Sequence, residues 1–124
     1  MTVYILSRLT ITDRTEYDKY ESQFEEIFSK FDGKLLSVDE EPLVIAGEWE
    51  ATRSVLIEFP SKESAFTWMQ SDAYQAISKH RNAGSRLSSI MVKALEEWSI
   101  KELQLNVQRP MIWMDWYNAN TIAP

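Results

Sequence analysis

The chain has no cysteine and a single histidine among its 124 residues. Without cysteine it can form no disulfide, thiolate nucleophile, iron–sulfur cluster or zinc ribbon. The histidine, His80, has no second histidine or acidic cluster near it at metal-ligand spacing, so the sequence predicts no metal site. His80 stands between Lys79 and Arg81 near the expected end of a helix. This position favours a solvated side chain, or one that interacts favourably with the helix dipole, over a haem ligand or a general base.

Glycine is also scarce, with three residues in the chain. Three glycines cannot build the glycine-rich loop that binds a dinucleotide, and the chain has neither a phosphate loop nor a nucleophile elbow. We therefore expect no flavin, nicotinamide or other cofactor. Any chemistry would then be cofactor-free acid–base or oxygen chemistry.

Long apolar runs and an excess of positive charge are missing as well. No segment approaches the roughly 18 apolar residues of a membrane helix, and residues 1–12 lack the features of a signal peptide. We expect a cytoplasmic protein without a membrane partner. The net charge of −6 argues against a nucleic-acid partner, because Lys and Arg dominate phosphate binding. One basic segment fits either a small acidic ligand or scattered solvated charges: Lys79, Arg81, Arg86 and Lys93.

The chain does have 44% hydrophobic residues, enough for one core in a domain of this length. Residues 3–11 alternate between the two faces of a strand. Asp13 and Glu16 form the start signature of a helix, and apolar residues then recur at helical spacing as far as Phe31. Gly33 is predicted to end this helix.

Residues 35–38 and 54–59 predict the second and third strands, with residues 43–46 as a short extension of the second. Ser61 and Asp72 each start a short helix, and Gly84 ends the later one. Residues 87–95 alternate loosely as a last strand. The order is therefore β-α-β-β-α-β. It predicts an α+β, ferredoxin-like protomer with an antiparallel sheet over residues 1–95.

Several motifs in these elements are similar to those of a known family. They are Gly47-Glu48-Trp49, the run VLIEFPS at 55–61, Ala65, Trp68, Ser71, the run YQAI at 74–77, and Arg81. On these motifs, residues 2–95 resemble domain-of-unknown-function family 1330, in the dimeric α/β-barrel group. The resemblance implies a homodimer whose protomers pair through the uncovered face of the sheet and leave a cleft there. It implies no particular reaction, because the group includes monooxygenases, haem-handling enzymes, isomerising enzymes and regulatory modules.

Alternation along the strands predicts which residues line this cleft. If the apolar positions face the helices, then the opposite face carries Tyr4, Leu6, Arg8, Leu56 and Glu58. Arg8 and Glu58 are the candidate catalytic residues, because they belong to neighbouring strands and could pair. Partial burial would shift the pKa of Glu58 and fit it for proton transfer or for a carboxylate clamp. The alternative is a structural ion pair at the dimer interface.

Three further residues complete the predicted cleft. Met91 is expected on the same face, together with Ser89 and Leu87, although the alternation of this strand is ambiguous. Arg81 and Trp49 enter only through the family motifs. Arg81 would bind an acid or cap a helix end, and Trp49 would cover the cleft mouth or pack against the first helix.

Residues 96–124 follow the predicted domain and contain three of the five tryptophans, Trp98, Trp113 and Trp116. So much aromatic surface predicts an arm that packs on the domain or on its partner.

For function, the sequence predicts a homodimer that binds a small, partly apolar organic molecule in the sheet-face cleft. The alternative is a non-catalytic interaction module whose cleft is filled by side chains or by the arm. Trp68 and Tyr74, which lie on helical stripes, are interpreted as packing residues.

Overall fold

The computed structural model describes residues 1–95, so the predicted arm at residues 96–124 lies outside the described residues. Residues 1–42 and 50–94 form one compact unit, and residues 43–49 belong to a second. The first unit contains every helix and strand of the described residues.

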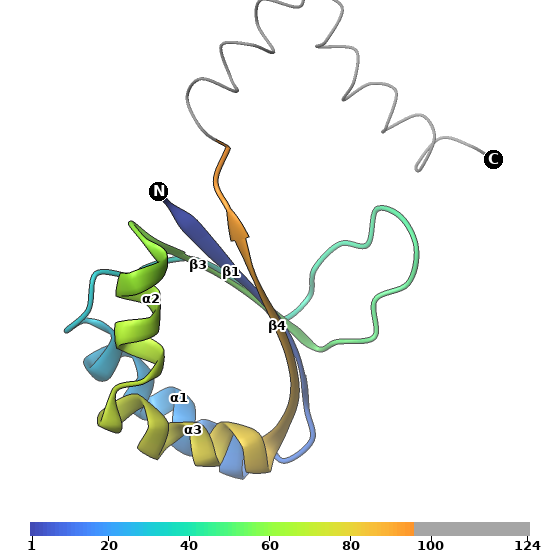
Figure 1. Ribbon diagram of the computed structural model, residues 1–124. Helices are drawn as coiled ribbons and strands as arrows, with labels where there is room; N and C mark the ends of the chain where they lie inside the picture. Colours follow the sequence, from blue (N-terminus) through green and yellow to red (C-terminus); the bar gives the residue numbers. More distant parts are fainter. Residues whose placement is uncertain (96–124) are drawn as a thin grey trace, which may run out of the picture. The chain divides into compact units, whose positions relative to one another are not determined.

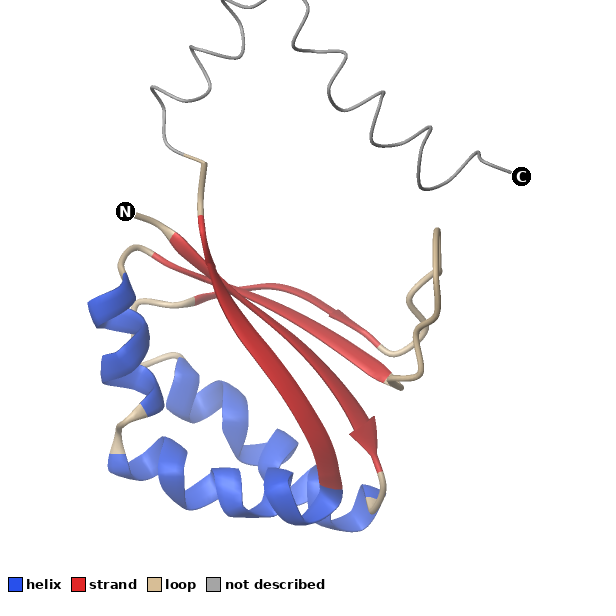
Figure 2. Ribbon diagram, turned by 45° about the vertical axis from the view of Figure 1, so that its right-hand side comes forward, coloured by secondary structure: helices blue, strands red, loops and turns tan. Residues whose placement is uncertain are grey.

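The first unit is a four-stranded antiparallel sheet with three helices packed on one face (Figure 1, Figure 2). Its strands are β1 (Val3–Ile11), β2 (Lys34–Asp39), β3 (Arg53–Phe59) and β4 (Ser85–Lys93), in the order β2-β3-β1-β4. Its helices are α1 (Arg14–Phe28), α2 (Lys62–Met69) and α3 (Asp72–Gly84). The predicted α+β, ferredoxin-like fold is confirmed. None of the described helices is long and apolar enough to cross a membrane.

Helix α1 begins where the sequence predicts and ends earlier. The Asp13 side chain accepts a hydrogen bond from the Glu16 backbone N–H at 3.2 Å, which satisfies a donor of the first turn. The helix ends at Phe28, so the prediction that Gly33 stops it is wrong. Gly33 serves close packing instead, because a Cβ there would lie 2.5 Å from ring carbons of Phe28 and Phe59.

The connection after β2 also differs from its prediction, because residues 43–46 form no strand. Strand β2 ends at Asp39, whose side chain accepts a hydrogen bond from the Glu41 backbone N–H at 2.8 Å and closes a turn. Pro42 follows and has no N–H to give to a sheet.

The two short helices begin at serine caps. Ser61 caps α2 as predicted, whereas α3 is capped by Ser71 rather than by Asp72. Gly84 is the last residue of α3, as predicted.

The core lies between the helices and the sheet. Trp68 of α2 is central to it, with its ring 5.4 Å from Phe59 of β3 and 4.3 Å from Tyr74 of α3. Its buried hydrophobic members come from both layers: Val3, Ile5, Leu9, Tyr17, Tyr20, Phe28, Ile57, Phe59, Ala65, Trp68, Tyr74 and Ile77.

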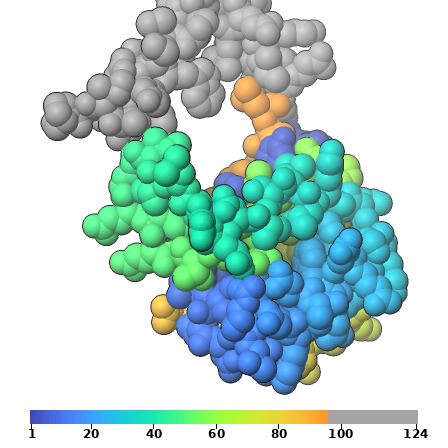
Figure 3. Space-filling model, turned by 180° about the vertical axis from the view of Figure 1, so that it is seen from behind, coloured from blue at the N-terminus to red at the C-terminus, as the bar shows by residue number. Residues whose placement is uncertain are grey.

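None of the described helices covers the other face of the sheet, which we call the open face (Figure 2). The register sets Leu56, Leu6 and Ile90 side by side across β3, β1 and β4. Leu6 is 41% exposed and Ile90 is 59% exposed. Strand β2 forms one edge of the sheet, and all six of its residues are exposed. Figure 3 shows this part of the chain, coloured cyan to teal, at the surface of the molecule.

Candidate functional site

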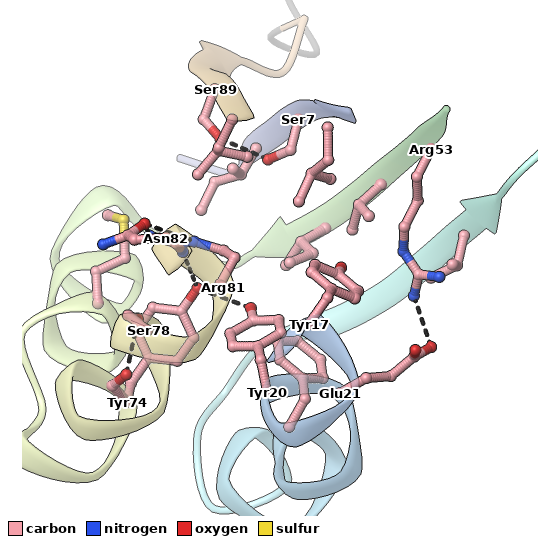
Figure 4. A pocket seen from close by; sticks show the side chains of 18 of the residues that line it. Ser7, Tyr17, Tyr20, Glu21, Arg53, Tyr74, Ser78, Arg81, Asn82 and Ser89 are labelled. Atoms are coloured by element: carbon pink, nitrogen blue, oxygen red, sulfur yellow. Dashed lines mark hydrogen bonds and ion pairs between the residues drawn. The ribbon is translucent and has the colours of Figure 1, made fainter. Parts of the chain in front are cut away.

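A cavity of about 320 Å³ lies between the helix-covered face of the sheet and the helices. Its sheet wall is mostly apolar and includes Ile5, Leu9, Val55, Ile57 and Leu87. Its helix wall carries aromatic rings with polar groups at their tips (Figure 4). The volume is at the lower end of the roughly 300–1,000 Å³ that is usual for small-molecule sites.

Three side chains of the helix wall form a hydrogen-bonded group, which we call the Tyr–Tyr–Arg cluster: Tyr20, Tyr74 and Arg81. The two hydroxyl groups lie 3.0 Å apart, and Nη1 of Arg81 donates to the hydroxyl of Tyr74 at 2.7 Å (Figure 4). The guanidinium carbon of Arg81 lies 5.7 Å from the ring centre of Tyr20 and 5.8 Å from that of Tyr74. These distances are typical of cation–π contacts.

The positions of the three residues on α1 and α3 explain how the cluster forms. Tyr74 and Arg81 are seven residues apart on α3, about two helical turns, so their side chains share one face. Tyr20 comes from α1, which packs against α3. Burial raises the pKa of Tyr20 far above that of a free phenol, with the neighbouring Tyr74 as a further cause. Tyr20 is therefore a neutral phenol in the folded protein.

A second arginine lines the cavity in a different electrostatic setting. Arg53 of β3 is buried and donates to Glu40 at 2.8 Å and to Glu21 at 2.9 Å. Its guanidinium carbon lies 5.5 Å from the ring centre of Tyr17. Hydrogen bonds from Arg14 and from Arg53 lower the pKa of the Glu40 carboxyl, so the partner stays ionised. The positive charge of Arg53 is therefore neutralised by the protein itself.

The hydroxyl groups of Ser7 and Ser89 contribute another polar spot. They lie 2.6 Å apart on neighbouring strands, and both residues line the cavity (Figure 4). The cavity thus has polar groups on both walls around a mainly apolar interior.

The structure separates five of the predicted cleft residues from this cavity. Tyr4, Leu6, Arg8, Leu56 and Glu58 share the open face, as alternation predicts. The cavity lies on the opposite side of the sheet.

The register does not set the two candidate catalytic residues opposite each other. Glu58 pairs with Tyr4, whereas Arg8 pairs with Ser54. Four residues of strand, about 13 Å, separate these two positions.

The predicted face of Met91 is wrong. Met91 pairs with Ile5, Ser89 with Ser7 and Leu87 with Leu9, so all three face the helices. Strand β4 carries apolar residues on both faces, with Ile90 exposed on the other one. The alternation of residues along β4 therefore does not show which of its faces points toward the helices.

The remaining predicted residues have separate locations. Arg81 lines the cavity on the helix side. Trp49 belongs to the unit of residues 43–49, so its role at a cleft stays a prediction. Nδ1 of His80 lies 2.6 Å from Oε1 of Glu16 and links α3 to α1, outside the cavity lining. This contact is the largest cause of the lowered pKa of Glu16. Within residues 1–95 no group of His, Asp and Glu is arranged to hold a metal ion.

The sequence did not indicate Tyr20 as a cavity residue, and it favoured packing as the main role of Tyr74 and Trp68. All three are buried, so the packing interpretation is correct, but all three also line the cavity. The available signal was the seven-residue spacing of Tyr74 and Arg81, which places a charged group on an otherwise apolar helical stripe.

Residues 2–95 match the family described as Domain of unknown function (DUF1330). The chain belongs to this family. No curated protein matches the DUF1330 chain.

Solved structures resemble the DUF1330 domain in fold. A protein of unknown function from Rhodopseudomonas palustris is 18% identical, with 77% of this chain and 83% of that chain covered and a TM-score of 0.67. The cofactor-independent oxygenase SnoaB from Streptomyces nogalater is 11% identical, with coverage of 77% and 94% and a TM-score of 0.56. A dimeric ferredoxin-like protein of unknown function from Thermobifida fusca is 7% identical, with coverage of 76% and 92% and a TM-score of 0.59. At these identities the likeness shows the fold alone.

Proposed function

We propose that this protein binds a small, partly apolar organic molecule in the cavity between the sheet and the helices. The observation that carries the proposal is the cavity of about 320 Å³, with an apolar sheet wall and the Tyr–Tyr–Arg cluster on its helix wall. An apolar wall and a few convergent polar groups are the usual composition of a small-molecule site.

A cavity of this size favours ligand binding over the alternative of a non-catalytic interaction module whose cleft is filled by side chains or by the arm. Protein interiors are close-packed, and the few voids within them are seldom larger than a water molecule.

Chemistry on the bound molecule, if it occurs, would be cofactor-free acid–base or oxygen chemistry in our proposal. One structural neighbour is described as a cofactor-independent oxygenase. The polar groups nearest to the molecule would be those of Tyr20, Tyr74 and Arg81. A neutral phenol can donate a hydrogen bond, and a guanidinium can stabilise a developing negative charge.

Native mass spectrometry, before and after incubation with octanoate, tests the site. We expect the wild type to carry a small molecule in at least one of these states. Ser7→Phe should abolish that binding, because Ser7 lines the cavity and the larger ring would occupy it. Ser22→Phe makes the same change at an exposed position of α1 and should leave binding intact. Binding by Ser7→Phe equal to that of the wild type, or no binding by the wild type, would contradict the proposal.

We further propose that the open face pairs with a second copy of the chain to form a homodimer. The row Leu56, Leu6 and Ile90 supports this proposal, because it presents apolar side chains on a face that no described helix covers. Two-fold pairing of identical surfaces is the commonest closed symmetry. The dimeric neighbour from Thermobifida fusca has the same fold.

A further inference from the structure

We infer that the molecule bound in the cavity is a small carboxylic acid with an apolar body, held through its carboxylate by the Tyr–Tyr–Arg cluster. This inference rests on the proposed function and adds the chemical class of the ligand.

The first argument is the charge of the cavity. Two arginines line it, and Arg53 is already paired with Glu21 and Glu40. No Asp or Glu of the described residues lies within ion-pair distance of Arg81. Arg81 is therefore a cation in a partly enclosed space whose countercharge the described residues do not supply.

The second argument is the number of donors on Arg81. A guanidinium has five N–H donors. Nη1 uses one for the hydroxyl of Tyr74, while Nε and Nη2 each donate to the side-chain oxygen of Asn82 at 3.3 and 3.1 Å. Within the described residues, one N–H on Nη1 and one on Nη2 have no protein acceptor. Two such N–H groups are what a carboxylate binds in its two-point geometry.

The third argument is the number of protons on the two phenols. The hydrogen bond between Tyr20 and Tyr74 uses one of their two hydroxyl protons. If Tyr74 donates this bond, the proton of Tyr20 has no acceptor among the described residues. If Tyr20 donates this bond, the hydroxyl of Tyr74 accepts from both Tyr20 and Arg81. The hydroxyl proton of Tyr74 then has no acceptor among the described residues. In either arrangement one phenol O–H is left to donate to a bound molecule.

The cluster therefore offers donors and a positive charge to the cavity, and this combination selects an anionic oxygen ligand. The opposite wall is apolar, with Ile5, Leu9 and Val55 among its residues. An inorganic anion has no apolar part to lie against that wall. A carboxylic acid with an alkyl or aryl body can do both: its carboxylate accepts hydrogen bonds from the cluster, and its body packs against the apolar wall.

A panel of acids and their neutral amides tests the inference by calorimetry on the full-length protein: benzoate, phenylacetate, hexanoate and octanoate, each with its amide. We expect at least one acid to bind with a Kd roughly 10- to 100-fold lower than that of its amide, because only the carboxylate places a negative charge opposite Arg81. Arg81→Gln should remove this preference. Arg86→Gln removes the same charge from an exposed residue of β4 and should keep it.

The phenol argument has its own test in two single variants and their combination. Tyr20→Phe and Tyr74→Phe each leave one phenol O–H near the ligand and should retain most of the affinity for the acid. The double variant leaves no phenol O–H in the cluster and should lose more affinity than the two single losses predict together.

The outcomes separate this inference from the proposed function. If the amides bind as well as the acids, the inference is overturned while the proposed function survives. If neither class binds, the inference fails, and native mass spectra without a bound molecule would show that the proposed function fails too. Retention of the acid preference in Arg81→Gln, with unchanged circular dichroism, would also overturn the inference.

Discussion

At the scale of single residues, the two arginines of the cavity show how surroundings assign different roles to one side-chain type. Arg53 donates to Glu21 and Glu40, whereas Arg81 donates to Tyr74 and Asn82, which are neutral. Two carboxylates therefore balance the charge of Arg53, whereas the described partners of Arg81 supply no negative charge. We therefore assign Arg53 to the stability of the fold and Arg81 to the ligand.

Replacing Arg53 by Met should reduce the free energy of unfolding by about 1–3 kcal/mol, as measured by urea denaturation. The side chain is buried and loses two charge-assisted hydrogen bonds, while solvent partly compensates its half-exposed partners Glu21 and Glu40. Arg86→Met is the matched control on exposed strand surface, with an expected change below about 0.5 kcal/mol. Equal effects of the two variants would refute the structural role of Arg53.

Glu16 should make stability depend on pH in the acid range. Its hydrogen bond with His80, helped by Lys19, lowers the pKa of the carboxyl in the folded protein. The ionised contact therefore stabilises the fold above the pKa of the unfolded chain, and this stabilisation is lost as the pH falls through the lowered folded pKa. Glu16→Gln should be less stable than the wild type at neutral pH and equally stable in strong acid. Denaturation curves that differ by the same amount at every pH would contradict this reading.

At the scale of helices and strands, the packing of α3 against the start of α1 depends on Gly84. Its carbonyl accepts hydrogen bonds from the backbone N–H groups of Thr12 at 2.9 Å and Asp13 at 3.1 Å. A Cβ at Gly84 would lie 2.6 Å from the backbone nitrogen of Tyr17 and 2.7 Å from the carbonyl oxygen of Asp13. Backbone atoms cannot move aside as a flexible side chain can, so only glycine fits here.

Gly84→Ala should therefore destabilise the protein by about 1–3 kcal/mol in thermal or urea unfolding, through overpacking. At an unconstrained helical position the same replacement would stabilise the protein, because alanine is favoured over glycine by roughly 1 kcal/mol. Ala83→Gly in the same helix is the comparison, because Ala83 is exposed and its change should cost only that propensity difference. A Gly84→Ala variant as stable as the wild type would disprove the close contact.

Much of this element structure follows from local sequence, and the exceptions have physical causes. Asp13 and Ser61 cap helices through their own side chains, so their role can be predicted from a few neighbouring residues. Gly33 was predicted to stop α1, but its small size serves the contact of Phe28 with Phe59, which are far apart in the chain. Such a long-range contact leaves no local pattern.

The candidate site was harder to predict than the fold. Alternation sorted the residues of β1 and β3 onto two faces, but nothing in the sequence showed on which face the packing would leave a cavity. Tyr20 and Tyr74 look like ordinary core residues, and they are buried. Their function as cavity residues depends on how α1 and α3 together stand away from the sheet.

At the scale of the whole molecule, the sheet has two faces with different proposed roles. The helix-covered face holds the cavity, whereas the open face presents Leu6 and Ile90. If the open face is the dimer interface, each protomer keeps its own cavity within its own helices and strands. Dimer formation and ligand binding can then be disturbed separately.

Ile90→Asp should convert a dimer of twice 14.5 kDa into a monomer in analytical ultracentrifugation at micromolar concentration. At the β4 end of the apolar row, the carboxylate would be buried in the interface without a partner, which is strongly unfavourable. Phe66→Asp introduces the same charge at an exposed apolar residue of α2 and should remain dimeric. A wild-type monomer, or an Ile90→Asp dimer, would exclude the open face as the interface.

The central claim is that the ligand binds on the helix side of the sheet, and methyl NMR during titration with octanoate tests it most directly. Methyl groups of Ile5, Val55 and Leu87 line the cavity, whereas those of Leu56 and Ile90 lie on the open face of the same strands. We expect chemical-shift changes that saturate with octanoate for the cavity methyls and much smaller ones on the open face. Changes confined to the open face, or none at either face, would contradict the claim.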